Sequence, residues 1–201
     1  MCGRYLIDDE AFDLREIIAA AERNSQKNPS QLAFRSGEIF PGNIAPVIDA
    51  RHETRFMLWG FPSLIAGKHP HINARSETAA AKRTFSDAIA SRRCLVPASG
   101  YYEWKTLGKN HKERYEFTLP DMMTMYMAGI YTEEDQFAIL TRAASPSVSD
   151  IHDRMPVILT KTFGDAWLSE SPDVICETLT EMQSRHIPNR SDRSMQMSLF
   201  S

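Results

Sequence analysis

The stretch CLVPASGYYEW, residues 94–104, contains two short runs of branched and aromatic residues. Such residues favour strands, so we predict one strand over residues 93–97 and a second over residues 101–106. Strands that follow one another without regular alternation with helices favour an antiparallel α+β arrangement over a doubly wound sheet. We therefore expect a single domain with a curved, mostly antiparallel β-sheet or irregular β-barrel core and flanking helices.

Similar runs extend this pattern in both directions along the chain. Residues 108–110 and the pair Pro120-Asp121 supply turn chemistry between neighbouring runs, which predicts hairpins. Further strands are predicted at residues 46–48, 54–60, 114–119, 122–131, 136–141 and 156–160. Helices are predicted at residues 8–24, 76–91, 161–169 and 172–182, and residues 25–44 are interpreted as a loop.

Length and composition bound the class of protein. With 201 residues, of which 42% are apolar, the chain can bury one core, and we predict one domain over residues 1–183. The composition becomes polar from Ser184 onward, so residues 184–201 are predicted to form a flexible tail. The region from Asp8 to Glu16 is acidic where a signal peptide would be apolar, and no run is long enough to span a membrane. We expect a cytoplasmic, nucleoid-associated monomer.

Charge is distributed unevenly. The net charge is −3, but residues 72–115 hold nine basic and four acidic side chains. This surplus fits either ordinary solvated side chains or a local patch for a polyanion. Three widely spaced cysteines, without a C-x-x-C pair, indicate neither a disulfide framework nor a zinc site, and we expect no metal and no organic cofactor.

Cys2 follows the initiator methionine directly. Methionine is generally removed before a small second residue, and removal would leave Cys2 with a free amine beside its own thiol. Such a 1,2-aminothiol condenses with an aldehyde to an imine, which the sulfur then closes into a thiazolidine ring. Both groups titrate near about 8, so a useful fraction of each is nucleophilic at neutral pH. A buried, incidental cysteine at the start of a strand is the alternative.

Three other polar side chains stand in apolar or turn-forming sequence. Glu103 lies among three aromatic residues, where desolvation would raise its pKa toward the range useful for proton transfer, unless strand alternation turns it outward. His152, in a predicted loop between acidic residues, is either an acid–base group or simply exposed. Asn73 either orients an amine or a sugar oxygen, or is a structural turn residue.

Taken together and in order, the segments MCGRY, NIAP, WG, INARSET, CLVPASGYYEW and IHDRMPVIL resemble the SOS response-associated peptidase (SRAP) family, which includes abasic-site shield proteins. The resemblance runs from Cys2 to about Trp167. It implies a protein that binds single-stranded DNA and links its N-terminal cysteine covalently to the ring-opened sugar of an abasic site, which protects the site during replication and the SOS response.

The resemblance also implies roles for individual residues. Cys2 would be the nucleophile and Asn73 would position the amine or sugar. Glu103 would transfer protons during imine formation and autolytic removal of Met1, and His152 would assist ring opening and reversal. DNA contacts are expected from Arg4, Asn43, Arg75, Arg83, Trp104 and Thr141.

Two other function classes remain open at the level of sequence. One is a thiol peptidase that uses Cys2 to cleave other proteins, and the other is a non-catalytic DNA-binding or clamp-binding adaptor. The adaptor hypothesis draws on the C-terminal segment QMSLF, which resembles the bacterial sliding clamp-binding pentapeptide, with Gln196 as the polar anchor and Leu199 and Phe200 as the apolar pair. The same segment can also be interpreted as a last strand that packs on the core.

Overall fold

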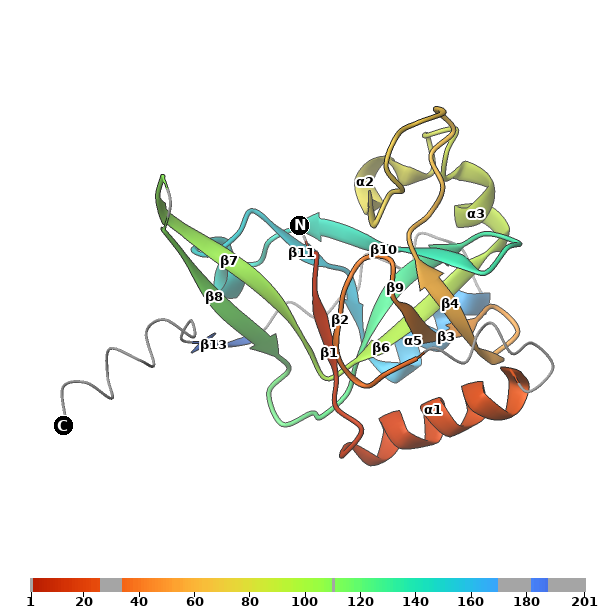
Figure 1. The fold of residues 1–201 in the computed structure, drawn as a ribbon, viewed down its shortest axis with the longest axis horizontal. Coiled ribbons are helices and arrows are strands. Elements are labelled where there is room, and N and C mark those ends of the chain that lie inside the picture. Colours follow the sequence, from red (N-terminus) through yellow and green to blue (C-terminus); the bar gives the residue numbers. More distant parts are fainter. Residues whose placement is uncertain (1, 26–33, 110, 170–181, 188–201) are drawn as a thin grey trace.

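The computed structural model describes residues 2–25, 34–109, 111–169 and 182–187. Strands dominate the chain, and helices lie at its surface (Figure 1). The helices are α1 (Phe12–Ser25), α2 (Ser76–Ala79), α3 (Ser86–Ser91), α4 (Pro146–Ser149) and α5 (Lys161–Ser169). The strands are β1 (Tyr5–Ile7), β2 (Gly37–Ile39), β3 (Ile44–Asp49), β4 (Thr54–Trp59), β5 (Asn73–Arg75), β6 (Arg93–Ala98), β7 (Gly100–Gly108), β8 (His111–Thr118), β9 (Met125–Tyr131), β10 (Gln136–Ala143), β11 (Arg154–Pro156), β12 (Ile158–Leu159) and β13 (Gln183–Ile187).

A closed ring of strands forms the centre of the molecule. β10 pairs with β4 in parallel, and the ring continues antiparallel through β3, β6 and β9 back to β10. The C-terminal part of β10, residues 139–143, also pairs with β5 and β11, while β12 pairs with β9. A closed ring leaves none of these five strands with a fully open edge, so the barrel needs no partner to satisfy its backbone.

A second sheet packs beside this barrel. Its strand order is β13-β8-β7-β1-β2, and all its strands pair antiparallel. The barrel strand β6 passes almost directly into β7, so residues 94–104 join the two sheets. β1 lies between β2 and β7, with Tyr5 directly opposite Tyr101. This pairing brings the start of the chain into the centre of the molecule (Figure 1).

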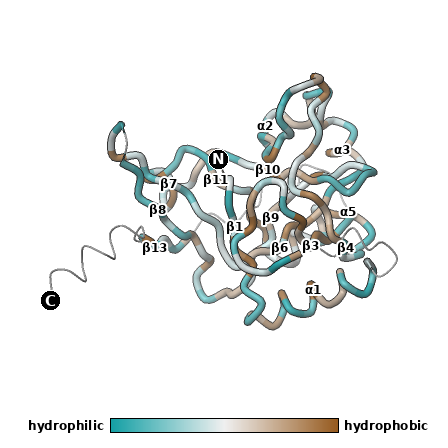
Figure 2. Tube along the Cα trace, in the orientation of Figure 1, coloured by the Kyte–Doolittle hydropathy of each residue, from teal (hydrophilic) through white to brown (hydrophobic). Residues whose placement is uncertain are grey.

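The apolar core fills the barrel and the space between the sheets. Trp59, Phe137 and Met57 are almost fully buried there, and Tyr5 and Tyr101 pack at the junction with the second sheet. Figure 2 shows hydrophobic residues concentrated on β3, β4 and β6, with more hydrophilic residues along α1 and the β7–β8 hairpin. α1 contacts β4 and β3, and α5 contacts β6, so the helices cover the outside of the barrel.

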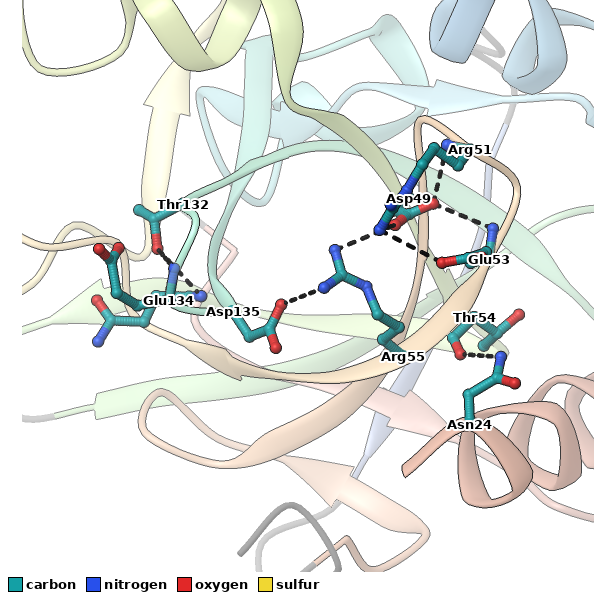
Figure 3. Close-up of polar contacts among 10 residues, drawn as sticks. Asn24, Asp49, Arg51, Glu53, Thr54, Arg55, Thr132, Glu134 and Asp135 are labelled. Carbon is teal, nitrogen blue, oxygen red and sulfur yellow. Dashed lines mark hydrogen bonds and ion pairs between the residues drawn. The ribbon is translucent and has the colours of Figure 1, made fainter. Parts of the chain in front are cut away.

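An ionic network ties two barrel hairpins together (Figure 3). Asp49 is fully buried, and its Oδ1 accepts backbone N–H groups from Arg51 and Glu53 at 2.8 and 3.0 Å. Arg55 bridges Asp49 Oδ2 at 3.0 Å and Asp135 Oδ1 at 2.7 Å. Because Asp49 ends β3 and Asp135 precedes β10, this bridge holds the β3–β4 turn against the β9–β10 turn.

The structure confirms the expected α+β class and the barrel core, and it corrects several boundaries. The single helix predicted over residues 76–91 is two short helices, α2 and α3, joined by turns. The chain bends there because Ala79 and Phe85 are both buried, and the ring of Phe85 meets Phe61 edge to face at 5.4 Å. Propensity alone cannot show that two faces of one helical segment must reach the same core.

Two further strands lie where loop or tail was predicted. β2 lies within the predicted loop over residues 25–44 and pairs with β1. β13 begins at Gln183 and pairs with β8 as far as Ile187, so the boundary expected between residues 183 and 184 falls inside a strand. Most of the helix predicted over residues 172–182, and the tail from residue 188 onward, lie outside the described residues.

Candidate functional site

Cys2 lies at the entrance to β1 and is fully buried. The side chain of Asn73 donates from Nδ2 to the Cys2 carbonyl oxygen at 2.8 Å, and the Cys2 thiol faces the Arg4 carbonyl at 3.8 Å. Burial raises the pKa of the Cys2 thiol well above its ordinary value, and the negative charge of Glu103 raises it further. In this state the sulfur is a protonated, weakly nucleophilic thiol.

The position of Asn73 follows from the barrel. Asn73 begins β5, which pairs with β10 in parallel and places Asn73 opposite Ile139. The backbone is therefore fixed, and the side chain reaches across to the first residues of the chain, 71 positions earlier in sequence. Among the described residues, Asn73 Oδ1 has no hydrogen-bond partner, so this buried acceptor remains available beside Cys2.

Glu103, on β7, is only 4% exposed, and its charge reaches the Cys2 thiol. Residues alternate along a strand, so Tyr101 and Glu103 share one face while Tyr102 and Trp104 share the other. Glu103 Oε2 lies 3.9 Å from His152 Nε2. Burial raises the pKa of Glu103, and the charge of His152 partly offsets this. A buried carboxyl with a raised pKa, placed beside an imidazole, is suited to proton transfer.

His152 has two alternative partners at Nδ1. The backbone N–H of Arg154 donates to Nδ1 at 3.0 Å, and Asp153 Oδ1 lies 2.9 Å from the same atom. A nitrogen that accepts a hydrogen bond carries no proton, so neutral His152 in this arrangement carries its proton on Nε2, facing Glu103. A protonated His152 would instead donate from Nδ1 to the exposed Asp153.

Arg154 holds the His152 loop in place. Its guanidinium forms a two-pronged ion pair with Glu77 at 2.7 and 2.9 Å, and it also donates to the Thr141 carbonyl oxygen at 2.6 Å. Hydrogen bonds from Arg154 lower the pKa of Glu77 to about 2. We did not single out Arg154 or Glu77 from sequence, although both belong to the quoted segments IHDRMPVIL and INARSET.

A cavity of about 550 Å³ opens next to these groups. Glu103 and His152 line it, together with Arg4 and Trp104. Its lining also includes Thr106 and Lys112. The cavity thus joins acid–base groups to a cation and an aromatic ring, a combination suited to a small polar molecule carrying negative charge.

The six residues expected to contact DNA occupy different environments. Arg75 and Arg83 are exposed. Arg4 packs over Trp104, which is partly buried. Asn43 is exposed, but its Oδ1 accepts the Phe40 N–H at 3.0 Å and so stabilises the turn before β3.

Thr141 does not fit the expectation of direct contact. It is fully buried, and its hydroxyl donates to the Ala74 carbonyl oxygen at 3.4 Å while its own carbonyl accepts from Arg154. The residue therefore lies behind the site and supports Arg154. The basic surplus of residues 72–115 is also smaller at the surface than its count suggests, because Arg93 is buried and donates to the Trp167 and Ile89 carbonyl oxygens.

Two buried tyrosines near Cys2 were not predicted from the sequence as part of the site. Tyr5 and Tyr101 are fully buried, and neither hydroxyl has a hydrogen-bond partner among the described residues. Burial raises the pKa of both hydroxyls, and the nearby Cys2 thiol adds to the effect. Aromatic residues at strand positions are usually core, so nothing in the sequence separates these two from the rest.

No group of three or more His, Cys, Asp or Glu side chains within the described residues is placed to hold a metal ion. In the same part of the chain, no helix has the length and apolar character needed to cross a membrane.

The fold and the site together define a barrel protein with a thiol at the second residue, held beside a carboxyl–imidazole pair. A family model described as SOS response associated peptidase (SRAP) matches residues 1–194, and the chain belongs to this family. This confirms the resemblance drawn from the sequence segments.

Curated relatives share about 30% of their residues with this chain. The abasic site processing protein YobE of Bacillus subtilis is 31% identical over 191 residues, which cover 84% of this chain and 82% of the relative. The abasic site processing protein YedK of Escherichia coli is 29% identical and covers 85% and 80%. Mouse abasic site processing protein HMCES is 28% identical over 144 residues, which cover 51% of this chain and 41% of HMCES.

Solved structures show the same fold. A protein from Bacteroides thetaiotaomicron superposes with a TM-score of 0.74 at 24% identity, covering 96% of this chain and 94% of its own. A phage-related protein from Bordetella bronchiseptica gives a TM-score of 0.70 at 23% identity, with 94% and 95% covered.

Proposed function

We propose that this protein processes abasic sites in single-stranded DNA by linking Cys2 covalently to the ring-opened sugar. The observation that carries the proposal is the position of Cys2, whose backbone accepts a 2.8 Å hydrogen bond from Asn73 and whose thiol is within electrostatic reach of Glu103, the partner of His152. The names of YobE, YedK and HMCES, which are abasic site processing proteins, support it.

The first step of the proposed reaction is hydrolysis of the bond between Met1 and Cys2. Water is consumed, methionine leaves, and the peptide nitrogen of Cys2 becomes a free amine. Glu103 serves here as the proton acceptor, since its buried carboxyl is near Cys2 and has a raised pKa. Until this step the Cys2 thiol is fully buried and protonated, so processing is what makes the residue reactive.

The second step joins the amine to the sugar. The amine nitrogen attacks the aldehyde carbon of the opened sugar to give a carbinolamine, which loses water to form an imine. The Cys2 sulfur then attacks the imine carbon, and the thiol proton passes to the nitrogen, so the ring closes with the net loss of one water. Glu103 and His152, 3.9 Å apart, move the protons, and His152 assists opening of the sugar ring.

The test uses a short single-stranded oligonucleotide with one natural abasic site. We expect wild-type protein to give an adduct that survives denaturing electrophoresis, and no adduct with undamaged DNA. Cys2→Ala, and a variant with an alanine inserted before Cys2, should both give none. Cys94→Ala is the matched control, because Cys94 is also fully buried and its thiol pKa is also raised. Loss of the adduct in Cys94→Ala but not in Cys2→Ala would overturn the proposal.

The same experiment separates the two competing classes. Cleavage of unrelated proteins without an adduct would favour a thiol peptidase acting in trans. Tight DNA binding without an adduct or cleavage would favour an adaptor.

We further propose that the tail binds the sliding clamp through Gln196, Leu199 and Phe200. These residues lie outside the described part of the chain, and the proposal rests on their sequence pattern alone. Deleting residues 195–201 should abolish clamp binding and leave adduct formation on free oligonucleotides intact. Clamp affinity retained by the truncated protein would contradict this.

A further inference from the structure

A carboxylate lies between two arginines on the face of β7 opposite to Glu103. Glu38, on β2, has its Oε2 3.4 Å from Arg4 Nη1 and its Oε1 2.6 Å from Arg114 Nη2. Arg4 lines the cavity that also contains Glu103 and His152. The three charged groups come from three parts of one sheet, and together they carry one net positive charge.

Aromatic rings hold both guanidinium groups in fixed planes. The guanidinium carbon of Arg4 lies 4.2 Å from the ring centre of Phe40 and 4.9 Å from that of Trp104. That of Arg114 lies 3.7 Å from the ring centre of Tyr102. Guanidinium groups packed on aromatic rings lose little conformational freedom when they bind an anion, so this pair is already arranged for a ligand.

Glu38 does not exhaust the donors of the pair. In the part of the chain that the structure describes, Nε of Arg4 and Nε of Arg114 are buried and have no acceptor. Arg4 and Glu38 are about a third exposed, at 28% and 33% of their side chains. Glu38 can therefore turn toward solvent, and another oxyanion can take its place.

We propose that Arg4 and Arg114 form a subsite for a DNA phosphodiester next to the reacting sugar, and that Glu38 occupies this subsite in the free protein. The inference rests on the proposed function, because it assumes that DNA enters the cavity. Glu38 acts as an internal competitor that each incoming phosphate must displace. Glu38 thereby lowers the affinity of the protein for DNA in general. A strand that also fills the rest of the site can best compensate for the cost of displacing Glu38.

The test measures affinity without the covalent step. The probe is a single-stranded oligonucleotide with a tetrahydrofuran site, which has no aldehyde, and binding is followed by fluorescence anisotropy between about 50 and 300 mM salt. Glu38→Gln should bind about 3- to 10-fold more tightly at low salt, since it removes the competitor for two arginines. A gain of affinity cannot come from misfolding.

Arg114→Gln should bind about 3- to 10-fold more weakly, and its salt slope should fall by about 0.7, the value for one lost phosphate contact on a single strand. In the Arg114→Gln background, the gain from Glu38→Gln should shrink markedly. Glu113→Gln is the matched control, because it removes the same charge one residue from Arg114 on the other face of β8. It should change affinity by less than about twofold.

Two results would overturn the subsite. One is unchanged affinity in Glu38→Gln, and the other is an equal gain from Glu38→Gln and Glu113→Gln. The covalent proposal is read separately, from the adduct that wild-type protein forms with natural abasic DNA. If wild-type protein forms the adduct but Glu38→Gln leaves DNA affinity unchanged, only the subsite proposal is wrong. If Glu38→Gln binds DNA more tightly but wild-type protein forms no adduct, only the covalent proposal is wrong.

Discussion

At the scale of single residues, Glu103 combines a catalytic role in the proposed function with a cost to stability. Its carboxyl is 4% exposed and its pKa is raised by burial. A carboxyl with a raised pKa in the folded state stabilises the fold fully only below its unfolded pKa, and this contribution is lost as the pH rises through the folded pKa. At neutral pH the buried carboxylate is therefore less favourable than a neutral group of the same shape.

We predict that Glu103→Gln separates these two effects. Adduct formation should slow by about 100-fold or more, since a proton-transfer group is removed. The midpoint of thermal unfolding at pH 7 should rise by about 2–4 °C, and the rise should disappear near pH 4. Calorimetry at both pH values checks this. A lower midpoint at pH 7 would show that the carboxylate stabilises the fold instead.

Arg114 illustrates a role that depends on neighbours and not on residue type. It lies directly opposite Trp104 in the β7–β8 pairing, and its ion pair with Glu38 crosses the sheet to β2. Charge counting groups it with the exposed Arg75 and Arg83, but only Arg114 shares a carboxylate with Arg4. Its contribution to DNA affinity should accordingly be coupled to Glu38, whereas Arg75 and Arg83 should act independently of it.

At the scale of secondary-structure elements, the Arg154–Glu77 pair joins β11 to α2. The pKa of Glu77 is lowered to about 2 from 4.5, so this pair stabilises the fold above about pH 4.5 and loses its effect as the pH falls toward 2. Because the Glu77 side chain is 47% exposed, solvent weakens the interaction.

We predict that Glu77→Gln lowers the free energy of unfolding by about 0.5–1 kcal/mol at pH 7, and that the difference vanishes at about pH 2. The adduct should also form more slowly, because Arg154 supports the loop that carries His152. Urea unfolding at several pH values tests the stability. Glu53→Gln, whose carboxylate meets the exposed Arg51, provides a control on the surface. An equal loss at pH 7 and pH 2 would contradict the ionic explanation.

Gly129 lies within β9, where close packing between barrel strands leaves no room for a side chain. A Cβ atom added there would lie 2.9 Å from Cys94 Sγ and 3.1 Å from the Ala138 carbonyl oxygen. We predict that Gly129→Ala lowers the free energy of unfolding by about 1–3 kcal/mol through overpacking. Gly108→Ala should change it by less than about 0.5 kcal/mol, because nothing lies within 4 Å of the added atom. Equal effects in denaturant unfolding would sink this explanation.

At the scale of the whole molecule, the barrel is closed by strands that are far apart in sequence. β10 pairs with both β4 and β9. The ion pairs of Arg55 with Asp49 and Asp135 connect the β3–β4 turn to the β9–β10 turn (Figure 3). Among the described residues, Arg55 is the only cation that reaches the buried Asp49 carboxylate and also bridges to the other turn, although the exposed Arg51 lies 3.6 Å from Asp49.

We predict that Arg55→Met lowers the free energy of unfolding by about 3 kcal/mol, the typical cost of removing one partner of a buried ion pair. The double variant Asp49→Asn, Arg55→Met should recover part of this loss, because it leaves no uncompensated buried charge. Chemical unfolding of the wild type and both variants measures their free energies of unfolding, which should rank wild type first, the double variant second and Arg55→Met last. A double variant less stable than Arg55→Met alone would contradict it.

The amino-acid pattern determined the class of fold and the family, and it supplied the candidates for the reacting groups. Runs of branched and aromatic residues set most barrel strands, and β3, β4, β6, β7, β8, β9 and β10 all overlap the predicted ranges. Cys2, Asn73, Glu103 and His152 stand in segments long enough to identify the family, because their chemistry requires particular residue types.

Only the tertiary structure decided how these parts meet. β1, β2, β5 and β13 are short or polar, and they are strands because neighbouring strands supply their hydrogen bonds. The fold also explains why Thr141 lies inside, why Arg154 reaches Glu77, and why Glu38 reaches Arg4 and Arg114. Local residue preferences act over a few positions, whereas these contacts join residues up to 77 positions apart, so only the closed barrel could bring them together.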